Sequence, residues 1–492
     1  MTGVPREMPT AGVAGAGGRI LAACVVNLGC KVNRIESDWM ERELREAGCA
    51  LVEECQADVV IVNTCAVTGE AEAKTRKAVR HAASLPHRPL VCVTGCVATL
   101  FPDEIAGLGE YVHVIADKGT VVREALRLLV EAGGAAESST PAMAPAPAES
   151  DALSESRAPV CATEAGASLS TLPAVAHAHE GDGTPESRLR RGVKVQDGCD
   201  NRCTYCIVWR ARGPVRSTPL DQIERQVRTV LNGGAGEIVL SGINLGRYHS
   251  TTADGTPVHL DGLLRRVVAL AGERAVVRAS SIEPPDVTPA LTETMAELRG
   301  HVCPHLHLPL QSGCDATLAR MGRVYDTEAF AAAVTMVREQ LPELSLSTDV
   351  IVGFPGETDE EFAQTLAFCR EMRFSKMHVF RFSARPDTPA ATMPNQVNPR
   401  VAQSRSERLR ALADEMRAED ARSRIGSVEP ILVERIAADG TARGTTASYH
   451  RAVVESADSR PGAIAPGLVR ARIESHDPRT RLLHARVVPA SA

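Results

Sequence analysis

The sequence predicts an α/β protein with three folded parts. Short apolar runs alternate with helix-like runs over residues 20–133 and again over residues 188–425, a pattern typical of parallel strands joined by helices. Residues 426–488 instead hold short strand-like runs separated by turns, which is typical of a small antiparallel β-barrel. The length of 492 residues agrees with a division into about three domains.

The first part, residues 20–133, is predicted to be an α/β domain with a parallel sheet. Its predicted strands are residues 20–27, 57–63 and 90–94. Its predicted helices are residues 36–47 and 69–83. Residues 1–19 are rich in Gly, Ala and Pro and lack the apolar stretch of a signal peptide, so we expect a disordered N-terminus. Residues 134–187 contain few large apolar side chains, so we expect a disordered linker.

The middle part, residues 188–425, repeats a strand–helix unit often enough to build a partial (β/α) barrel. Its predicted strands are residues 237–240, 275–279, 305–308, 347–352 and 377–382. A charged helix over residues 403–424 is predicted to be an outer or bridging element. In the last part the predicted strands are residues 431–433, 452–454, 468–473 and 482–488, with an Asp439-Gly440 turn between them.

Composition limits the class of protein. The net charge of −6 excludes a polycation, so any nucleic-acid contact must come from local basic patches. An aromatic content of 3% excludes a wide base-stacking platform. The chain has no run of about 18 apolar residues and no export signal, so we expect a cytoplasmic protein that makes no membrane contact. In that compartment the fourteen cysteines are better explained as metal ligands or buried residues than as disulfides.

The strongest local signal is a CxxxCxxC loop formed by Cys199, Cys203 and Cys206. A structural zinc site usually needs four ligands in two pairs, and no second pair follows nearby. Three thiolates can hold three corners of a [4Fe–4S] cube and leave one iron open. The open iron can chelate the amino and carboxylate groups of a methionine moiety. Zinc binding stays the alternative interpretation of these three residues.

A second set of cysteines is dispersed, with Cys30, Cys65 and Cys96 each placed just after an apolar run. The carboxyl ends of parallel strands share one edge of a sheet, so these residues are predicted to converge there. The alternative is that they are small buried apolar residues. We apply that interpretation to the other eight cysteines, which are Cys24, Cys49, Cys55, Cys92, Cys161, Cys303, Cys314 and Cys369.

The CxxxCxxC loop and four later motifs together resemble the radical S-adenosylmethionine methylthiotransferases. The later motifs are Gly242-Ile-Asn244, Ser280-Ser281-Ile-Glu283-Pro284, His307-Leu-Pro-Leu-Gln311-Ser-Gly313 and Thr348-Asp349 through Thr358. The resemblance covers residues 20–133 and 189–488. It implies two [4Fe–4S] clusters, one on Cys199, Cys203 and Cys206 and an auxiliary one on Cys30, Cys65 and Cys96. It also implies an S-adenosylmethionine site for which we predict Gly242, Asn244, Ser281, Gln311 and Asp349, because barrel strand ends face the active site.

The family chemistry implies that one S-adenosylmethionine methylates a sulfur and another yields a 5′-deoxyadenosyl radical. The radical removes hydrogen from C2 of an adenine in tRNA, and a methylthio group replaces it. We assign no catalytic side chain, because the abstraction requires no protein base. An external electron donor such as flavodoxin or ferredoxin is implied. The alternatives of another class are a two-cluster electron carrier and a zinc-bearing RNA-binding protein without catalysis.

The Gly29-Cys30-Lys31-Val32-Asn33 motif resembles the subgroup that acts on N6-threonylcarbamoyladenosine next to the anticodon. The subgroup that acts on isopentenyladenosine more often has Gln-Met in place of Lys31-Val32, and the subgroup that acts on a ribosomal protein aspartate more often has Pro-Lys. The sequence therefore favours the product 2-methylthio-N6-threonylcarbamoyladenosine and leaves the two other substrates as alternatives.

Two basic regions are candidates for RNA contact. Residues 70–83 carry Lys74, Arg76, Lys77 and Arg80, which either contact phosphates or form a solvated helix face. The terminal barrel resembles a TRAM domain, an RNA-binding module. Its candidate residues are Arg435, Arg443, Arg451, Arg470, Arg472 and Arg486.

The chain also departs from the family pattern. Val97 and Thr99 follow Cys96 where Tyr and Gln are common. Trp209-Arg210 replaces a common Pro-Tyr, and Asp387 stands where Gly is usual. We expect these changes to affect the details of the substrate pocket and to leave all six cysteine ligands in place.

Overall fold

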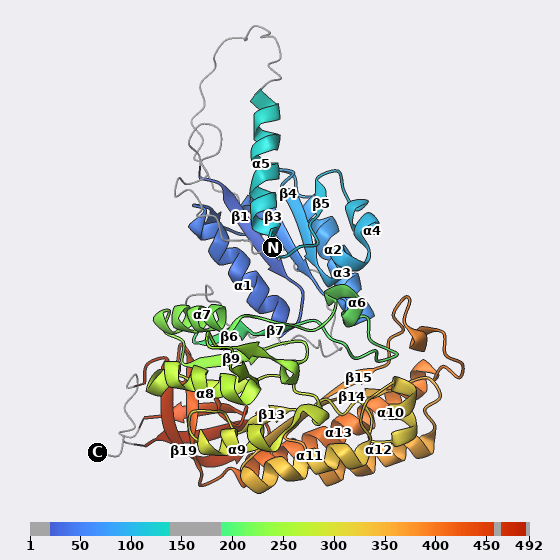
Figure 1. Ribbon diagram of the computed structural model, residues 1–492, viewed down its shortest axis with the longest axis vertical. Coiled ribbons are helices and arrows are strands. Elements are labelled where there is room, and N and C mark those ends of the chain that lie inside the picture. The colour runs from blue at the N-terminus through green and yellow to red at the C-terminus, as the bar shows by residue number, and fades with distance from the viewer. Residues whose placement is uncertain (1–19, 138–187, 457–463, 489–492) are drawn as a thin grey trace. The chain divides into compact units, whose positions relative to one another are not determined.

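The computed structural model describes residues 20–137, 188–456 and 464–488 (Figure 1). The described residues divide into two compact units, one comprising residues 20–65 and 70–137 and the other residues 66–69, 188–456 and 464–488. The expected disordered N-terminus, residues 1–19, lies outside the described residues, as does the expected linker from residue 138 onward.

The N-terminal unit is built on a parallel sheet with the strand order β2-β1-β3-β4-β5, which confirms the predicted class. The strands are β1 (Ala22–Asn27), β2 (Ala50–Leu51), β3 (Val59–Thr64), β4 (Leu90–Gly95) and β5 (Val112–Val114). The helices are α1 (Lys31–Glu46), α2 (Gly69–Ala83), α3 (Cys96–Leu100), α4 (Pro102–Ala106) and α5 (Val121–Glu137). The helix α5 includes residues 134–137, the first four of the expected linker.

One face of this sheet is covered by α1 and α5 (Figure 1). Met40 and Leu44 of α1 and Leu126 of α5 pack against buried residues of β3 and β4. The strands β3 and β4 are buried along their whole length, as expected for central strands of a parallel sheet. The sequence missed β2 and β5, because strands of two and three residues carry too little pattern to be detected.

The second unit contains six parallel barrel strands in two neighbouring sheets, with the orders β12-β9-β6 and β13-β14-β15. A parallel bridge between Ser281 and His307 lies between the two sheets. The strands are β6 (Arg190–Lys194), β9 (Glu237–Ser241), β12 (Val276–Ala279), β13 (His305–His307), β14 (Ser345–Val352) and β15 (Lys376–Arg381). The partial barrel and its strand–helix alternation are thus confirmed.

The helices of this barrel are α7 (Leu220–Asn232), α8 (Leu260–Ala271), α9 (Pro289–Glu297), α10 (Asp315–Met321), α11 (Thr327–Gln340) and α12 (Asp359–Met372). Local capping sets their ends. At α12, the Thr358 hydroxyl accepts a hydrogen bond from Glu361 N (3.2 Å), and the Glu361 carboxylate accepts one from Thr358 N (3.1 Å). The charged helix predicted over residues 403–424 is α13 (Pro399–Ser423), which packs against β15.

The two faces of the barrel strands differ in polarity. In β9, Ile238 and Leu240 belong to the main apolar core, whereas Glu237 and Ser241 share the other face because strand side chains alternate. His305 and His307 both lie within 3.0 Å of the Ser347 hydroxyl on the neighbouring strand. The two imidazoles and the Ser347 hydroxyl therefore form hydrogen bonds between β13 and β14.

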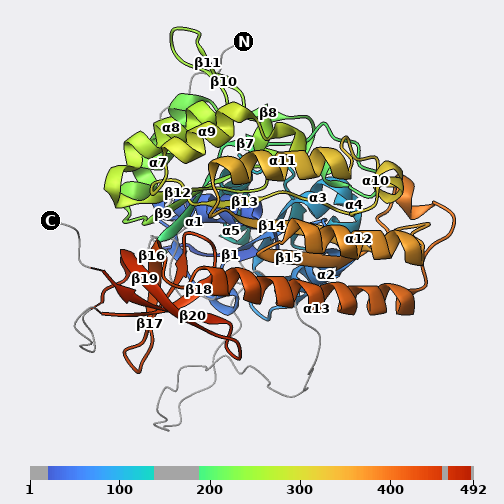
Figure 2. The same ribbon diagram turned by 90° about the horizontal axis from the view of Figure 1, so that it is seen from below.

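The C-terminal part is a closed barrel in the order β16-β17-β18-β20-β19, and Figure 2 shows it at one end of α13. Its strands are β16 (Val428–Ile436), β17 (Ala442–Thr446), β18 (Arg451–Glu455), β19 (Gly467–Asp477) and β20 (Leu482–Val487). The small β-barrel is confirmed, with β17 as a strand that the sequence missed. Four of its ladders are antiparallel and the β18–β20 ladder is parallel, because five strands cannot alternate in direction around a closed ring.

The loop between β17 and β18 attaches this barrel to the amino end of the larger one. The Tyr449 ring lies 4.6 Å from the Arg278 guanidinium and 5.1 Å from the Lys376 ammonium. Arg278 also donates to the Ala447 carbonyl (2.9 Å). The two barrels of this unit are therefore joined by buried cation–π and hydrogen-bond contacts. None of the helices in the described parts of the chain has the length and apolar character needed to span a membrane.

Candidate functional site

The CxxxCxxC loop follows the short strand β7 (Gln196–Asp197) at the carboxyl end of β6. Cys199 N donates to Gly213 O (3.1 Å), and Thr204 N donates to Met321 O at the end of α10 (2.9 Å). Gly198 enters the loop at a φ of +73°, and a Cβ there would lie 1.9 Å from Pro214 O. Only glycine fits this position, which fixes where the cysteines begin.

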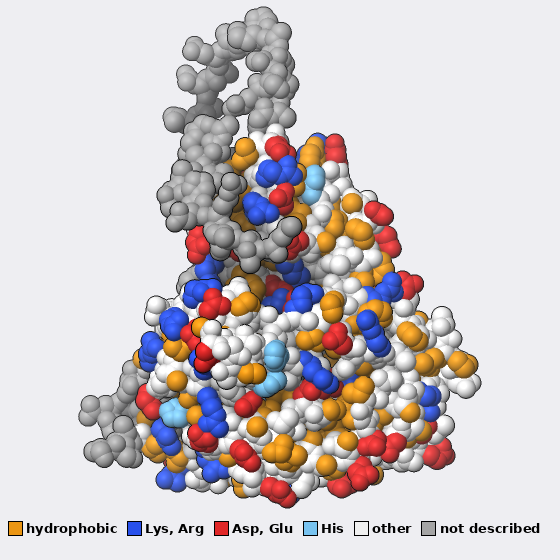
Figure 3. All heavy atoms as spheres, viewed as in Figure 1, with side chains coloured by type: hydrophobic (Ala, Val, Ile, Leu, Met, Phe, Trp, Pro, Cys, Tyr) orange, Lys and Arg blue, Asp and Glu red, His pale blue; other side chains and the backbone are white. Residues whose placement is uncertain are grey.

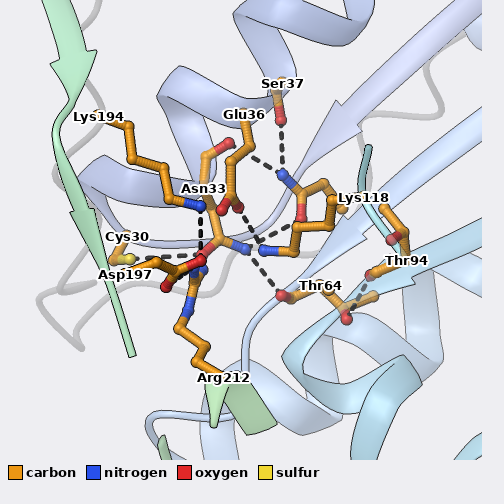
Figure 4. A network of polar contacts seen from close by, with 12 residues as sticks. Cys30, Asn33, Glu36, Ser37, Thr64, Thr94, Lys118, Lys194, Asp197 and Arg212 are labelled. Atoms are coloured by element: carbon orange, nitrogen blue, oxygen red, sulfur yellow. Dashed lines mark hydrogen bonds and ion pairs between the residues drawn. The ribbon is translucent and has the colours of Figure 1, made fainter. Parts of the chain in front are cut away.

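The carboxylate of Asp197 anchors the start of the loop. It accepts hydrogen bonds from Gly198 N (2.9 Å), Arg212 Nη1 (3.0 Å) and Lys194 Nζ (2.6 Å), and the two cationic partners are drawn in Figure 4. Burial by itself raises the pKa of Asp197, but the charges of Arg212 and Lys194 outweigh it and the pKa is lowered. Asp197 is therefore a charged, fixed support beneath the cysteine loop.

The three thiols of the loop lie close enough to interact electrostatically. Burial raises the pKa of Cys199, and it raises the pKa of Cys206 to about 12, with smaller contributions from the neighbouring cysteines. Cys203 is 6% exposed. The raised pKa values favour the protonated form of Cys199 and Cys206, which become thiolates with a positive partner such as cluster iron.

The dispersed cysteines lie at the ends of three adjacent strands. Cys30 follows β1, Cys65 follows β3, and Cys96 follows β4 as the first residue of α3. The strands β1, β3 and β4 are in register, because Asn27, Asn63 and Thr94 are paired across them. The predicted convergence at one sheet edge is therefore present, with Cys65 and Cys96 buried and Cys30 exposed.

Buried amides and hydroxyls hold these strand ends together (Figure 4). Asn33 Nδ2 donates to Asn63 Oδ1 (3.1 Å) and to Thr64 O (2.8 Å), and Asn63 Nδ2 donates back to Asn33 O (2.9 Å). The Thr64 hydroxyl donates to Thr94 O (2.7 Å) and accepts from Val97 N (3.1 Å). This network connects the segments that carry Cys30, Cys65 and Cys96.

Each cysteine set offers three thiols as possible ligands. Across the residues that the structure describes, no three His, Cys, Asp or Glu side chains stand close enough to hold a metal ion. The donor sets nevertheless fit the chemistry of a cluster, because each offers three thiols and leaves one iron of a cube open.

Gly242 and Asn244 lie directly after β9 and are positioned by Gln196. Asn244 N donates to Gln196 Oε1 (2.8 Å), while Gln196 Nε2 donates to Asp197 O (2.7 Å) and Gly198 O (2.8 Å). A Cβ on Gly242 would lie 2.7 Å from Gln196 Oε1, so glycine is required for this close approach. The fully buried Gln196, which the sequence did not single out, thus connects the cysteine loop to the predicted cofactor residues.

Three buried oxygens near this point lack a partner. Asn244 Oδ1, Ser241 Oγ and Ser280 Oγ have no hydrogen-bond partner in the described part of the chain. Asn244 and Ser241 are at most 3% exposed and Ser280 is 7% exposed. Buried polar atoms are almost always hydrogen-bonded in folded proteins, so three exceptions at one strand edge indicate a place for a polar ligand.

The other predicted cofactor residues lie on the neighbouring strands. Ser281 is bridged to His307, and His307 Nε2 lies 3.3 Å from the Asp349 carboxylate. Gln311 has a φ of +65°, and its backbone is held by Asp349 O (2.8 Å) and Ile351 N (2.9 Å). A left-handed non-glycine residue held on both sides is typical of a functional position. The predicted set therefore spans β9, β12, β13 and β14.

A second feature that the sequence missed is a buried arginine against the cysteine loop. Arg323 Nη1 donates to Cys203 Sγ (3.1 Å) and lies 3.3 Å from the Tyr205 hydroxyl. Its other nitrogens contact the Glu283 carboxylate and the Tyr325 hydroxyl. The sequence identified the motif that contains Glu283. It did not predict the contact with Arg323, because the two residues are forty positions apart in the sequence.

Two departures from the family pattern contact each other. Arg210 Nη1 lies 3.2 Å from the Asp387 carboxylate and donates to Asp387 O (3.3 Å). Asp387 has a φ of +60°, which explains why glycine is usual at this position. Beside them, the Arg202 guanidinium stacks 4.0 Å from the Trp209 ring. The two substitutions thus form one surface contact next to the cysteine loop.

Two of the four predicted basic residues of α2 are paired with carboxylates of the same helix. Lys74 is paired with Glu70 (2.8 Å), and Arg76 is paired with Glu72 (2.6 Å). Lys77 and Arg80 are exposed. A solvated face therefore explains half of the basic residues on this helix, and two cations stay available for a phosphate.

Four of the six candidate arginines of the C-terminal barrel form cross-strand pairs, whereas Arg451 lies opposite Thr445 and Arg470 lies opposite Pro430. Arg435 lies opposite Arg443, and Arg472 lies opposite Arg486, so each pair shares a face of the barrel wall. Arg486 is neutralised by Glu455 (2.8 Å) and Glu474 (2.9 Å). Figure 3 shows Lys and Arg side chains interspersed with acidic ones on the visible face of this unit.

The interpretation of the remaining cysteines as buried residues is confirmed for most of them. The buried ones are Cys49, Cys92, Cys303, Cys314 and Cys369. Cys24 and Cys55 are only partly buried, and Cys161 lies outside the described residues. Burial raises the pKa of Cys92 and of Cys369 to about 12, so these thiols are inert.

Two family descriptions match the chain. Residues 193–369 match the Radical SAM superfamily, and residues 22–117 match a group described as Uncharacterized protein family UPF0004. Among solved structures, the radical S-adenosylmethionine methyltransferase TsrM from Kitasatospora setae gives a TM-score of 0.48 at 14% identity over 75% of each chain, a similarity too distant to bear on function.

Curated relatives match over most of the chain. The threonylcarbamoyladenosine tRNA methylthiotransferase MtaB of Thermotoga maritima is 33% identical over 86% of this chain and 89% of its own. MtaB of Bacillus subtilis is 34% identical over 83% of both chains. The tRNA-2-methylthio-N(6)-dimethylallyladenosine synthase of Desulfotalea psychrophila is 31% identical over 86% of this chain and 90% of its own. The chain therefore belongs to the radical S-adenosylmethionine methylthiotransferases, enzymes that use S-adenosylmethionine and [4Fe–4S] clusters.

Proposed function

We propose that this enzyme transfers a methylthio group to C2 of N6-threonylcarbamoyladenosine next to the tRNA anticodon, giving 2-methylthio-N6-threonylcarbamoyladenosine. One cluster is held by Cys199, Cys203 and Cys206, and an auxiliary cluster is held by Cys30, Cys65 and Cys96. An external one-electron donor, such as a flavodoxin or ferredoxin, completes the reaction.

The observation that carries the proposal is the combination of three loop thiols with unpartnered buried oxygens at the same end of the barrel. Ser241, Asn244 and Ser280 supply the oxygens, and Gln196 connects them to the loop through its own hydrogen bonds. A ligand with both amino and hydroxyl groups satisfies such oxygens, and S-adenosylmethionine carries both. Neither a two-cluster electron carrier nor a zinc-bearing RNA-binding protein requires this arrangement.

The side chains of this protein bind and orient the ligand and exclude water from it. When bound, the reduced cluster with S-adenosylmethionine supplies a 5′-deoxyadenosyl radical. Gln196 holds the Asn244 backbone at the ligand. The Asp349 carboxylate on β14 and the His307 imidazole on β13 lie 3.3 Å apart and provide polar groups beside it. Asp197 keeps the loop in place through its ion pairs with Lys194 and Arg212. No side chain is needed to remove a proton from the adenine carbon.

Two observations support the threonylcarbamoyl substrate over the isopentenyl one. The Gly29-Cys30-Lys31-Val32-Asn33 motif resembles that subgroup, and Asn33 holds the strand ends of β3 through two hydrogen bonds. The MtaB relatives of Thermotoga maritima and Bacillus subtilis, which are named for this substrate, are 33% and 34% identical. Relatives named as tRNA-2-methylthio-N(6)-dimethylallyladenosine synthases are 31% to 33% identical, so the motif after Cys30 is the stronger of the two observations. RNA contact is proposed for Lys77 and Arg80 and for the exposed pair Arg435 and Arg443.

Mass spectrometry of tRNA nucleosides from a deletion strain tests the substrate. We expect the 2-methylthio derivative of N6-threonylcarbamoyladenosine to disappear and the unmodified nucleoside to accumulate. The wild-type gene is expected to restore the 2-methylthio derivative. Cys369→Ala is expected to restore it as well, because Cys369 lies in the barrel core and belongs to neither cysteine set. Cys203→Ala is expected to restore nothing.

Persistence of the derivative at its normal level, in a strain with no second such enzyme, contradicts the proposed substrate. Loss of 2-methylthio-isopentenyladenosine instead assigns the enzyme to the other tRNA subgroup. Loss of the methylthio group from a ribosomal protein aspartate, with tRNA unchanged, moves the substrate to protein. The clusters are tested separately, because the purified enzyme should hold about eight iron atoms per chain.

A further inference from the structure

We propose that Arg323 sets the reduction potential of the cluster held by Cys199, Cys203 and Cys206, and that Glu283 opposes it. Arg323 acts as a positioning and electrostatic residue: it makes a charged hydrogen bond to the sulfur of one ligand, Cys203. This inference rests on the cluster assignment made in the proposed function.

The position of Arg323 is fixed by backbone structure on both sides of the contact. The helix α10 ends at Met321 and is followed by Gly322, whose φ is +68°, and Arg323 N donates to Leu318 O (3.0 Å) across the last turn. Thr204 N and its hydroxyl donate to Met321 O and Arg320 O at 2.9 Å each. The cysteine loop and the arginine are therefore attached to the same helix end.

The surroundings exclude water from the contact. The Arg323 side chain is 3% exposed and Cys203 is 6% exposed. The guanidinium lies 4.7 Å from the Tyr325 ring centre, and its nitrogens also contact the two tyrosine hydroxyls. A charge in such a site is screened only weakly, so it acts strongly on a neighbouring sulfur.

The direction of the effect follows from charge. Adding one electron to a [4Fe–4S] cluster makes the cluster and its thiolates more negative, and hydrogen bonds to the sulfurs and nearby charge set the potential. The Arg323 guanidinium stabilises the reduced form and so raises the potential. The carboxylate of Glu283, paired with the far side of Arg323, reduces that positive field. The two residues therefore act in opposite directions.

The structure offers a matched control for the pair of Arg323 and Glu283. The chain buries another arginine–carboxylate pair, in which Arg405 contacts Glu357 (2.7 Å), and no cysteine takes part in it. Arg405→Lys is therefore a matched control for the general cost of disturbing a buried pair. A merely structural role for Arg323 predicts that both arginine variants change stability and neither changes the potential.

The test is an EPR-monitored redox titration of the full-length chain with dithionite as the electron source. Cys30, Cys65 and Cys96 are changed to Ala in every sample, so that only the loop cluster is present. The variants in this background are Arg323→Gln, Arg323→Lys, Glu283→Gln and Arg405→Lys. Iron content and the EPR signal confirm the cluster before each titration.

We expect Arg323→Gln to lower the equilibrium constant for one-electron reduction at least tenfold, a shift of about −59 mV. Glu283→Gln is expected to shift the potential upward. Arg323→Lys, which keeps the charge, is expected to shift it less than the Gln variant, and Arg405→Lys is expected to leave it unchanged. If Arg323→Gln does not fold, the potentials of Arg323→Lys and Glu283→Gln decide the outcome.

Equal potentials in all variants that hold the cluster overturn the inference, as do shifts of the same sign in Arg323→Gln and Glu283→Gln. Absence of any cluster in the parent background is a different result. It contradicts the cluster assignment of the proposed function, because iron analysis detects it before any potential is measured.

Discussion

The two ends of the barrel strands β9 and β12 differ in whether their buried polar groups have hydrogen-bond partners. At the amino end, the Glu237 carboxylate accepts hydrogen bonds from Arg278 (2.7 Å) and Arg190 (3.0 Å), so its oxygens are fully paired. At the carboxyl end, four residues later on β9, Ser241 keeps a buried hydroxyl without a partner in the described residues. Ser280, just after β12, does the same.

This difference separates the part of the barrel that stabilises the fold from the part that binds a ligand. Each buried polar atom without a partner costs about 1–3 kcal/mol of stability. The same barrel pairs three buried charges at its amino end, so the sequence is able to supply partners for buried polar groups. The three unpaired oxygens at the carboxyl end are therefore a specific feature of that end. The unpaired end is the one that carries the cysteine loop and the predicted cofactor residues.

The largest expected effect is at the paired end. Glu237→Gln leaves Arg190 and Arg278 without their buried counter-charge, so we expect the free energy of unfolding to fall by about 3–5 kcal/mol. Urea unfolding monitored by circular dichroism measures it. The affinity of the folded variant for S-adenosylmethionine is expected to stay within about twofold, and a larger loss contradicts the separation of the two ends.

The same residue gives a pH dependence. Burial alone raises the pKa of Glu237, but Arg190 and Arg278 outweigh burial and lower it from 4.5 to about 2. A carboxyl with a lowered folded-state pKa contributes stability above its unfolded pKa and loses that contribution as the pH falls. We expect the wild type to lose this contribution between pH 4.5 and pH 2. Glu237→Gln should show a flatter acid dependence over that range, and equal slopes contradict the ion-pair account.

A smaller effect is expected where the ligand end is closely packed. A Cβ on Gly242 lies 2.7 Å from Gln196 Oε1, so Gly242→Ala must displace Gln196 from Asn244. We expect the affinity for S-adenosylmethionine to fall at least about tenfold, with a stability loss of about 1–3 kcal/mol. Equilibrium dialysis measures the affinity. The control is Gly262→Ala in α8, where the nearest atom is a Val258 methyl at 3.3 Å.

Removing an unpaired hydroxyl should have a smaller effect of the opposite sign on stability. Ser280→Ala deletes a buried oxygen without a partner, so we expect the ligand-free protein to gain about 0.5–1 kcal/mol while its affinity for S-adenosylmethionine falls. The matched control is Ser345→Ala at the amino end of β14, where the hydroxyl donates to Ser375 Oγ (2.7 Å). That variant should lose about 1 kcal/mol, and loss of stability in both variants removes the contrast.

The smallest effect is expected at the surface contact beside the loop. The Arg210–Asp387 ion pair is half-exposed, so Arg210→Ala should change the free energy of unfolding by less than about 1 kcal/mol. Thermal unfolding at low and high salt measures it, and the difference from the wild type should shrink with salt. A salt-independent loss of several kcal/mol indicates instead that the loop depends on this contact.

The two cysteine sets show how far sequence reasoning reaches. Cys199, Cys203 and Cys206 lie within eight residues, so their spacing alone indicated a shared site. The rule that parallel strands end at one edge of a sheet predicted that Cys30, Cys65 and Cys96 lie at the same edge. The three strands are aligned in this way, because Asn27, Asn63 and Thr94 are paired across them. Their roles as cluster ligands stay predictions. The glycine, serine and glutamine motifs also mark strand ends, because each motif follows an apolar run.

By itself, the sequence determined the fold class, the places of most strands and both cysteine sets, because apolar periodicity and residue spacing are local properties of the chain. It missed β17 and the parallel β18–β20 ladder, since closure of a ring of five strands is a property of the whole barrel. Only the tertiary structure decided that Arg323 contacts Cys203 and that Ser280 stays unpaired. Pairing between distant polar groups depends on how the strands and helix ends are packed, and no local pattern records that.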